Sequence, residues 1–253
     1  MSTTKIALLT GGSRGLGKSM AQHLAKKGLD VILTYHSQQA EAAGVVGEIT
    51  ALGRKAVALQ LDTSTVNGFD AFFEQVKTAL RDTFGTAKFD FLINNVGTGL
   101  YAPFAETTEE QFDQALTIHF KGSFFLTQKA LPLLNDGGGI VNISSGLTRI
   151  INPSSSAYAS MKAAMEVLTK YQAKELGSRR IQVNIVAPGA IETDFGGGRT
   201  RDNKQINAHL ASLTALGRVG LPEDIGPVVA FLCTDEARWI NAQRLEASGG
   251  MSI

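Results

Sequence analysis

Tyr158 and Lys162 are the two residues whose types and spacing most clearly suggest chemistry. They stand four positions apart in the run Ser-Ser-Ser-Ala-Tyr158-Ala-Ser-Met-Lys162, so on a helix both side chains project from one face. A phenol beside an ammonium group makes a proton donor, because the positive charge stabilises the phenolate and brings the pKa of the phenol down toward neutral pH. A packed tyrosine next to a solvated lysine has the same spacing. The pair therefore indicates acid–base chemistry only in a suitable context.

A glycine-rich turn near the N-terminus provides part of that context. The apolar segment at residues 5–9 is followed at once by the run Thr10-Gly11-Gly12-Ser13-Arg14-Gly15-Leu16-Gly17-Lys18. Glycines permit a tight turn and a close backbone approach, so that amide N–H groups and the dipole of the next helix can face a pyrophosphate. We therefore expect a dinucleotide cofactor to contact Gly11, Ser13, Arg14, Gly15, Leu16 and Gly17.

The elements that must position these residues alternate along the chain. Short apolar runs predict strands at residues 5–9, 31–34, 56–61, 89–93, 140–143 and 181–186, and longer patterns predict helices at 15–28, 38–52, 66–84, 108–134 and 156–177. Pro132 is expected to end or kink the fourth helix. This alternation, with strands that are apolar nearly throughout, predicts one α/β domain over residues 1–253, built on a doubly wound parallel sheet with helices on both faces.

The end of the second strand bears on the choice of cofactor. Enzymes that prefer NAD(H) usually carry an acidic residue there, which binds the ribose 2′-hydroxyl. This strand ends instead in Tyr35, His36 and Ser37, and the next carboxylate, Glu41, is already in the following helix. Arg14 can pair with a 2′-phosphate and Ser37 can hydrogen-bond it, although Arg14 can also be a solvated loop cation. We therefore expect NADP(H) in preference to NAD(H).

Two further loops follow expected strands, at the edge where ligands of such sheets bind. Asp62, after the third strand, can accept the adenine amino group or cap the next helix. The run Asn94-Asn95-Val96-Gly97 follows the fourth strand. Its asparagines can stabilise the turn itself or hold the nicotinamide ribose, and the two roles are compatible.

Charge and composition exclude several other classes of protein. The 24 basic and 23 acidic residues nearly cancel, which argues against nucleic acid as a partner. The single cysteine, Cys233, lies in an apolar run typical of a core and cannot form an internal disulfide. No apolar run is long enough for a membrane span or signal peptide. We expect a cytoplasmic protein with no membrane partner and no metal site.

Several ordered motifs together resemble the short-chain dehydrogenase/reductase family. They are the glycine-rich turn at 10–17, the run at 94–97, Ser145, Tyr158 with Lys162, Pro188-Gly189-Ala-Ile191-Glu-Thr193, Leu216-Gly217-Arg218-Val219-Gly220-Leu-Pro222-Glu223-Asp224-Ile225, and Ser248-Gly249-Gly250. The resemblance covers nearly the whole chain. It implies a single Rossmann-type domain with a seven-stranded sheet.

The resemblance also implies a role for each site residue. Tyr158 is the general acid in carbonyl reduction and the base in alcohol oxidation, and Lys162 lowers its pKa and binds the nicotinamide ribose. Ser145, thirteen residues before the tyrosine, matches the serine that orients the substrate oxygen. The cofactor supplies the hydride. Pro188, Gly189, Ile191 and Thr193 are expected to line the nicotinamide carboxamide. Asp62 on the adenine side, with Asn95, Val96 and Gly97, completes the expected cofactor contacts.

Two positions depart from the family pattern. The family commonly has an asparagine in the fourth helix that helps hold a water next to the lysine, and the matching residue here is His119. Histidine can still make one hydrogen bond at each ring nitrogen, or it can be a structural residue remote from proton transfer. Val96 stands where many members have alanine, and its extra methyl groups are expected to shift the loop only slightly.

The substrate side is expected at residues 98–101, 147–153 and 193–214, with a mobile lid near 193–215 whose basic tip holds Arg199, Arg201 and Lys204. These bases can attract an anionic substrate or merely keep the lid soluble. The resemblance implies a homotetramer packed through the fourth and fifth long helices and the C-terminal strand. The leading hypothesis is a reversible NADPH-dependent carbonyl reductase. The alternatives are a 3-oxoacyl thioester reductase of fatty-acid synthesis and a non-catalytic nicotinamide-nucleotide sensor.

Overall fold

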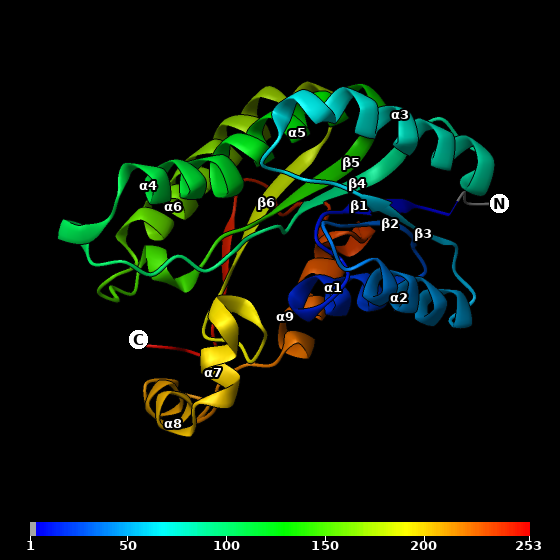
Figure 1. Ribbon diagram of the computed structural model, residues 1–253. Coiled ribbons are helices and arrows are strands. Elements are labelled where there is room, and N and C mark those ends of the chain that lie inside the picture. Colours follow the sequence, from blue (N-terminus) through cyan, green and yellow to red (C-terminus); the bar gives the residue numbers. More distant parts are fainter. Residues whose placement is uncertain (1–3) are drawn as a thin grey trace.

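The fold is built on one seven-stranded sheet in which every pairing is parallel (Figure 1). The structure, a computed structural model, describes residues 4–253. Its strands are β1 (Ile6–Leu9), β2 (Asp30–Tyr35), β3 (Ala56–Gln60), β4 (Phe89–Asn94), β5 (Leu134–Ile143), β6 (Gln182–Pro188) and β7 (Arg244–Ala247). Their spatial order is β3-β2-β1-β4-β5-β6-β7, which confirms the expected doubly wound sheet. The order reverses between β1 and β4, so the crevice for a ligand lies beyond the carboxyl ends of those strands.

Helices cover both faces of the sheet (Figure 1). One layer holds α1 (Gly15–Lys26), α2 (Gln39–Ala51) and α9 (Pro222–Leu232), and the other holds α3 (Phe69–Ala79), α4 (Glu109–Leu116), α5 (Gly122–Ala130) and α6 (Ser156–Glu175). Alternate residues of the strands feed two separate cores. In β1, Ala7 and Leu9 pack with α1, α2 and α9, whereas Ile6 and Leu8 pack with α3 and α5. The sheet is therefore buried on both sides, as its hydrophobicity predicts.

The expected helix at 108–134 is interrupted. A single π-helical turn, Thr117–Lys121, joins α4 to α5, and a 3-10 turn, Leu131–Leu133, follows α5. Pro132 lies in that 3-10 turn and has no amide hydrogen to continue an α-helix, which confirms the expected ending. The expected helix at 66–84 likewise consists of a 3-10 turn, α3 and a π-helical turn, Leu80–Phe84.

Strand β5 begins at Leu134, not at the expected residue 140. Its first half is the polar, glycine-rich run 134–139, which lacks the hydrophobicity of a buried strand. The pairing of β5 with β4 shifts register between Phe89 and Phe91. A side chain at Gly138 would collide with the Asp90 carbonyl oxygen, so the absence of a Cβ lets this irregular edge pair.

The segment expected as a lid is partly helical. It contains a 3-10 turn, Phe195–Gly198, followed by α7 (Arg199–Asp202) and α8 (Lys204–Ser212), which project away from the sheet in Figure 1. Consecutive glycines at 196–198 all have positive φ values, which explains why the chain can turn sharply before α7. Within residues 4–253, every helix is too short or too polar to cross a lipid bilayer.

Candidate active site

The glycine-rich turn is held tightly between β1 and α1. Gly11 has a φ of +67°, and its amide donates to the Thr34 side chain at 3.1 Å. A Cβ on Gly17 would overlap the Gly11 carbonyl oxygen, so only glycine fits there. The first turn of α1 carries no acidic residue, and the side chain of its N-cap residue makes no hydrogen bond to its amides. The N-terminus of α1 can therefore face an anionic pyrophosphate.

Arg14 occupies the N-cap position of α1, and its side chain has a partner in the lid segment. Its guanidinium lies 3.7 Å from the Asp194 carboxylate, and more than half of its side chain is exposed. An ion pair this exposed contributes little to stability and can exchange partners. At the adjacent end of β2, Tyr35 is half-buried and His36 and Ser37 are exposed. None of these three is acidic, so this edge offers no repulsion to a 2′-phosphate.

Asp62 does not cap a helix in this structure. Its carboxylate accepts hydrogen bonds from the Ser64 amide at 2.8 Å, the Ser64 hydroxyl at 2.6 Å and the Thr65 hydroxyl at 3.1 Å. These bonds, chiefly that of the Ser64 hydroxyl, lower the pKa of Asp62. The carboxylate is thus ionised and oriented within a local turn at the carboxyl end of β3.

Asn95 ties the loop after β4 to the glycine-rich turn. Its side-chain amide donates to the carbonyl oxygens of Thr10 at 2.9 Å and Gly11 at 3.0 Å, and its backbone amide donates to the Thr10 hydroxyl at 2.9 Å. Val96 also faces the turn, because a Cβ on Gly11 would meet its side chain at 3.2 Å. The structure therefore shows Asn95 stabilising the turn, which is one of the two roles considered for the run at residues 94–97.

The loop after β6 closes the same crevice from the other side. Ile191 forms an isolated bridge to Gly220, and a Cβ on Gly189 would lie 2.8 Å from the Ser248 backbone. Thr193 faces the glycine-rich turn, since a Cβ on Gly15 would meet it at 3.6 Å. The stretch from Pro188 to Thr193 thus lies opposite α1, where the sequence places the nicotinamide.

Tyr158 and Lys162 lie one turn apart on the buried face of α6. Only 7% of Tyr158 and 4% of Lys162 is exposed. The Lys162 ammonium donates to the Ile143 carbonyl oxygen at 2.8 Å, at the carboxyl end of β5, and lies 5.8 Å from the centre of the Tyr158 ring. The Ser145 side chain is near enough to Tyr158 to lower the pKa of its phenol. The structure therefore brings Ser145, Tyr158 and Lys162 together, as the sequence predicts.

The pKa of Tyr158 shifts in the opposite direction from the one the sequence suggests. Burial raises it above its ordinary value, the nearby Ser145 side chain lowers it in part, and Tyr101 adds to the increase. Burial also lowers the pKa of Lys162 to about 8. Burial therefore outweighs the expected lowering of the Tyr158 pKa by Lys162, because the loss of solvent acts on both groups and the ammonium donates to a backbone carbonyl. The role of Lys162 in lowering that pKa stays a prediction.

The two neighbouring serines have different partners. The Ser144 hydroxyl donates to the Glu166 carboxylate at 2.6 Å. The Ser145 hydroxyl accepts from the Leu147 amide at 3.2 Å, which leaves its proton available to a substrate oxygen. This difference supports Ser145 over Ser144 as the residue that meets the substrate.

His119 lies in the π-helical turn between α4 and α5, directly beside this cluster. Its ring meets the Tyr158 ring edge-on at a centroid distance of 4.9 Å, and a Cβ on Gly97 would lie 3.2 Å from its Cε1. It is 1% exposed, and within residues 4–253 neither ring nitrogen has a hydrogen-bond partner. Burial, together with the Lys162 charge, lowers its pKa to about 3, so the ring is neutral at ordinary pH.

Aromatic side chains close the site on the lid side. The Phe195 ring lies 5.8 Å from that of Tyr158, measured between centroids. Tyr101 packs on the backbone of Gly196, where a Cβ would come within 2.9 Å of its ring, and the Arg199 guanidinium lies 5.7 Å from the ring centre. The reacting groups are therefore bordered by flat, apolar surfaces.

The basic residues of the lid are partly neutralised. Arg201 pairs with Asp194 at 2.5 Å and with Asp202 at 2.7 Å. Arg199 stands over Tyr101, as described above. This arrangement favours the solubilising role of the lid cations over the attraction of an anionic substrate.

Sequence reasoning missed Glu166, which bonds Ser144 behind the reacting groups. The signal was available, because Glu166 lies four residues after Lys162 and therefore on the same face of α6. Its partner on β7, Arg244, could not be predicted, since the hydrophobicity pattern indicates no strand at residues 244–247.

Three comparisons with known proteins agree with this geometry. The family model described as enoyl-(acyl carrier protein) reductase matches residues 11–252. Tetrahydroxynaphthalene reductase PfmaG of Pestalotiopsis fici is 38% identical over 257 residues, covering 97% of this chain and 91% of that protein.

Two solved structures of reductases are similar to this chain over nearly its whole length. The promiscuous reductase LugOII, which catalyses keto-reduction at C1 during lugdunomycin biosynthesis, is 37% identical and covers 100% of both chains with a TM-score of 0.94. The angucycline C-6 ketoreductase LanV, solved with bound NADP, is 35% identical with a TM-score of 0.93, covering 99% of this chain and 96% of that chain.

Proposed function

The chain belongs to the short-chain dehydrogenase/reductase family and is an oxidoreductase, and we propose that it uses NADPH to reduce the keto group of an aromatic substrate. The observation that carries the proposal is the meeting of Ser145 and Tyr158 side chains beside the buried Lys162 ammonium. A relative named for reduction of a hydroxynaphthalene and neighbours named as ketoreductases support it.

The residues around the crevice fit NADP(H). The tight turn from Gly11 to Gly17 and the N-terminus of α1 hold the pyrophosphate, while Asp62 faces the adenine. Arg14 and Ser37 bind the 2′-phosphate, with Tyr35 and His36 alongside. Arg14 leaves its weak, exposed contact with Asp194 to do so. The structure of LanV with bound NADP supports the same cofactor here.

The reacting groups divide the chemistry among them. When bound, NADPH supplies a hydride to the carbonyl carbon. Ser145 donates a hydrogen bond to the carbonyl oxygen, and Tyr158 gives that oxygen its proton as negative charge develops. Lys162 stabilises the phenolate that remains and holds the nicotinamide ribose. The same groups run in reverse for alcohol oxidation.

His119 assists as a neutral hydrogen-bonding group beside Lys162. Among the described residues, the two nitrogens of this buried imidazole have no hydrogen-bond partner, so the ring can hold a water molecule through its N–H or its lone pair. That water can pass on a proton while the ring itself stays neutral. The low pKa of His119 supports this role, because the ring has a lone pair available at every ordinary pH. The relay then replenishes the proton that Tyr158 loses.

The aromatic surroundings support the choice of substrate. Phe195 and Tyr101 offer flat faces to a fused ring system, which stacks without needing a charged partner. The description of the matching family model keeps an acyl-carrier thioester as the second candidate substrate. A sensor without turnover is disfavoured, since Ser145, Tyr158 and Lys162 are all assembled.

A substrate panel tests the proposal. We would measure oxidation of NADPH and NADH with a tetralone, an acetoacetyl thioester and a keto sugar. The expected result is the highest kcat/KM with NADPH and the tetralone. Faster use of the thioester would replace the aromatic substrate with the second candidate, and equal use of NADH would contradict the roles given to Arg14 and Ser37. No turnover with any pair would overturn the proposed function.

A further inference from the structure

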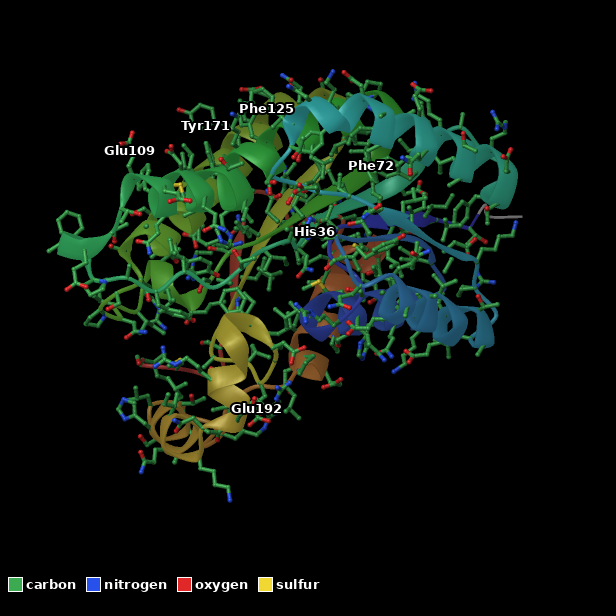
Figure 2. All side chains as sticks on the ribbon, viewed as in Figure 1. His36, Phe72, Glu109, Phe125, Tyr171 and Glu192 are labelled. Carbon is green, nitrogen blue, oxygen red and sulfur yellow. The ribbon has the colours of Figure 1, made fainter. Side chains whose placement is uncertain are left out.

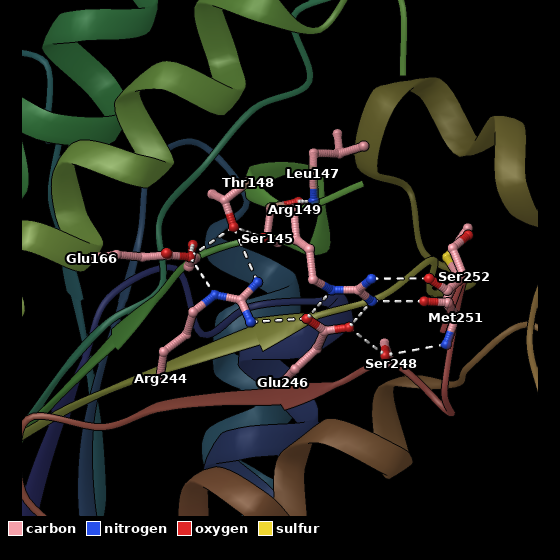
Figure 3. Close-up of polar contacts among 11 residues, drawn as sticks. Ser145, Leu147, Thr148, Arg149, Glu166, Arg244, Glu246, Ser248, Met251 and Ser252 are labelled. Carbon is pink, nitrogen blue, oxygen red and sulfur yellow. Dashed lines mark hydrogen bonds and ion pairs between the residues drawn. The ribbon is translucent and has the colours of Figure 1, made fainter. Parts of the chain in front are cut away.

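A network of four charged side chains lies behind the reacting groups (Figure 3). It joins Glu166 of α6, Arg149 of the loop after β5, and Arg244 and Glu246 of β7. The Arg244 guanidinium bridges the two carboxylates, with bonds of 2.8 Å to each. Arg149 binds Glu246 from the other side through its Nε at 3.0 Å. The two positive and two negative charges cancel within the network.

Glu166 connects this network to the loop that carries Ser145. Its carboxylate accepts from the hydroxyl of Ser144 at 2.6 Å and from that of Thr148 at 2.8 Å, so it holds the loop on both sides of Ser145. The Thr148 hydroxyl also lies 3.0 Å from the Ser145 carbonyl oxygen. The loop is thereby fastened to the same helix that carries the proton donor.

The other end of the network reaches the C-terminal segment. Arg149 donates to the backbone carbonyl oxygens of Met251 at 2.7 Å and Ser252 at 3.0 Å. The Ser248 hydroxyl donates to Glu246 at 2.9 Å. Residues 244–252 therefore brace the Ser145 loop from behind, and the pKa of Glu246 is lowered to about 2, chiefly by its bond with Arg149.

We propose that Glu166 is a positioning residue, which fixes the Ser145 hydroxyl relative to Tyr158 and Lys162 by clamping the Ser145 loop onto α6. The inference rests on the proposed function, because Ser145 must meet the substrate oxygen for its position to matter. Glu166 itself touches none of the reacting atoms. Its spacing explains the effect, since Tyr158, Lys162 and Glu166 follow one another at four-residue intervals along one helical face.

The burial of the network separates this role from that of a surface ion pair. Side chains of Glu166, Arg244 and Glu246 are at most about one-quarter exposed. Removing the Glu166 carboxylate leaves the Ser144 hydroxyl without its partner. It also takes one partner each from Arg244, which keeps Glu246, and from Thr148, which keeps the Ser145 carbonyl oxygen, so the loop is held less firmly on α6. A small displacement of Ser145 weakens a hydrogen bond that strengthens in the transition state, and kcat falls more than nucleotide affinity.

The test compares Glu166→Ala, Glu166→Gln and Ser144→Ala with the wild-type protein. We expect Glu166→Ala to lower kcat for the tetralone by about tenfold or more, while the Kd for NADPH stays within about twofold. Glu166→Gln keeps an acceptor oxygen and should lose less. Amide hydrogen exchange, which needs no turnover, should become faster at residues 144–150 and stay unchanged in the glycine-rich turn.

Asp136→Asn is the matched control, because Asp136 also pairs with an arginine that binds backbone carbonyls, Arg179, but at the opposite end of β5. It should leave kcat and exchange at 144–150 unchanged. If Glu166→Ala unfolds, Ser144→Ala decides, since it removes one bond of the clamp. Unchanged exchange at 144–150 together with wild-type kcat would overturn the inference. An inactive wild-type protein would overturn the proposed function, while the exchange data would still decide whether Glu166 clamps the loop.

Discussion

Burial governs the acid–base behaviour of the side chains in this site. Tyr158 and Lys162 are both buried. Burial shifts the pKa of each in the direction that favours its uncharged form, upward for the phenol and downward for the ammonium. A phenol kept protonated is suited to giving a proton to a carbonyl oxygen as charge develops there. The Lys162 ammonium, whose pKa is about 8, is still mostly protonated at neutral pH and can stabilise that negative charge.

Replacing Tyr158 by phenylalanine removes the proton donor and keeps the ring. We expect Tyr158→Phe to lower kcat on the order of a thousandfold, because general acid catalysis is lost, with little change in the Kd for NADPH. Steady-state kinetics and fluorescence titration measure the two quantities. Tyr171→Phe, on the exposed side of the same helix, is the control and should leave both unchanged. A Tyr158→Phe enzyme with near-normal kcat would exclude this role.

His119 makes the stability of the protein depend on pH. Its pKa is about 6.5 in an unfolded chain and about 3 in the folded protein, so between these values the unfolded state binds more protons. The contribution of the neutral His119 ring to the free energy of unfolding is fully present above pH 6.5 and is lost as the pH falls toward 3. From pH 7 to 5 the loss is about 2 kcal/mol.

Urea unfolding at pH 7 and pH 5 measures this contribution. We expect His119→Asn to reduce the pH dependence of the unfolding free energy by about 2 kcal/mol over that range, whatever its effect on the absolute value. His209→Asn, on the exposed surface of α8, should leave the pH dependence as it is. Equal pH dependence in the wild type and His119→Asn would show that His119 is charged or solvated in the folded protein.

At the level of elements, the π-helical turn between α4 and α5 explains how His119 reaches the site. An uninterrupted α-helix would turn each side chain by 100° per residue, whereas one wider turn inserts an extra residue and changes the facing of those around it. Thr117–Lys121 is that turn. The periodicity of residues 108–134 correctly predicted helical structure there. It could not predict the π-helical turn, because one wider turn hardly changes the spacing of apolar residues along the segment.

The lid contributes an aromatic contact that can be removed separately. Phe195→Ala deletes the ring that faces Tyr158, and we expect KM for the tetralone to rise by about tenfold with a smaller change in kcat. The acetoacetyl thioester should be affected less, because it has no ring to stack. Trp239→Ala, an exposed aromatic outside the lid, serves as the control. An unchanged KM would remove Phe195 from the substrate surface.

Across the whole molecule, the parts predictable from sequence are those with a strong local pattern. Six apolar strands, the glycine-rich turn and the Tyr158–Lys162 spacing are recognisable from hydrophobicity, glycine content or periodicity. Strand β7, with the sequence Arg-Leu-Glu-Ala, does not, because its polar residues point into the charged network. The position of Glu166 relative to Ser144 likewise depends on how β5, α6 and β7 pack, which no single segment specifies.

The outer surface of α4, α5 and α6 carries apolar side chains that suit self-association. Phe112, Phe124, Val167 and Tyr171 are all exposed there, and Figure 2 shows Tyr171 and Phe125 along this edge. We propose that the protein is a homotetramer that packs partly through this face. Sedimentation equilibrium should give four copies, and Tyr171→Glu should give smaller species, because a buried carboxylate is costly. A monomeric wild-type protein would refute the proposal.

The lone Cys233 offers a built-in reporter of motion. It ends α9, is completely buried, and has a thiol whose pKa is raised by that burial. A thiol reagent can label it only when the core packing around the end of α9, a helix that packs on α1, opens transiently. The labelling rate therefore records transient opening of that half of the protein without any added probe, and slower labelling with NADPH would measure how far ligand binding steadies it.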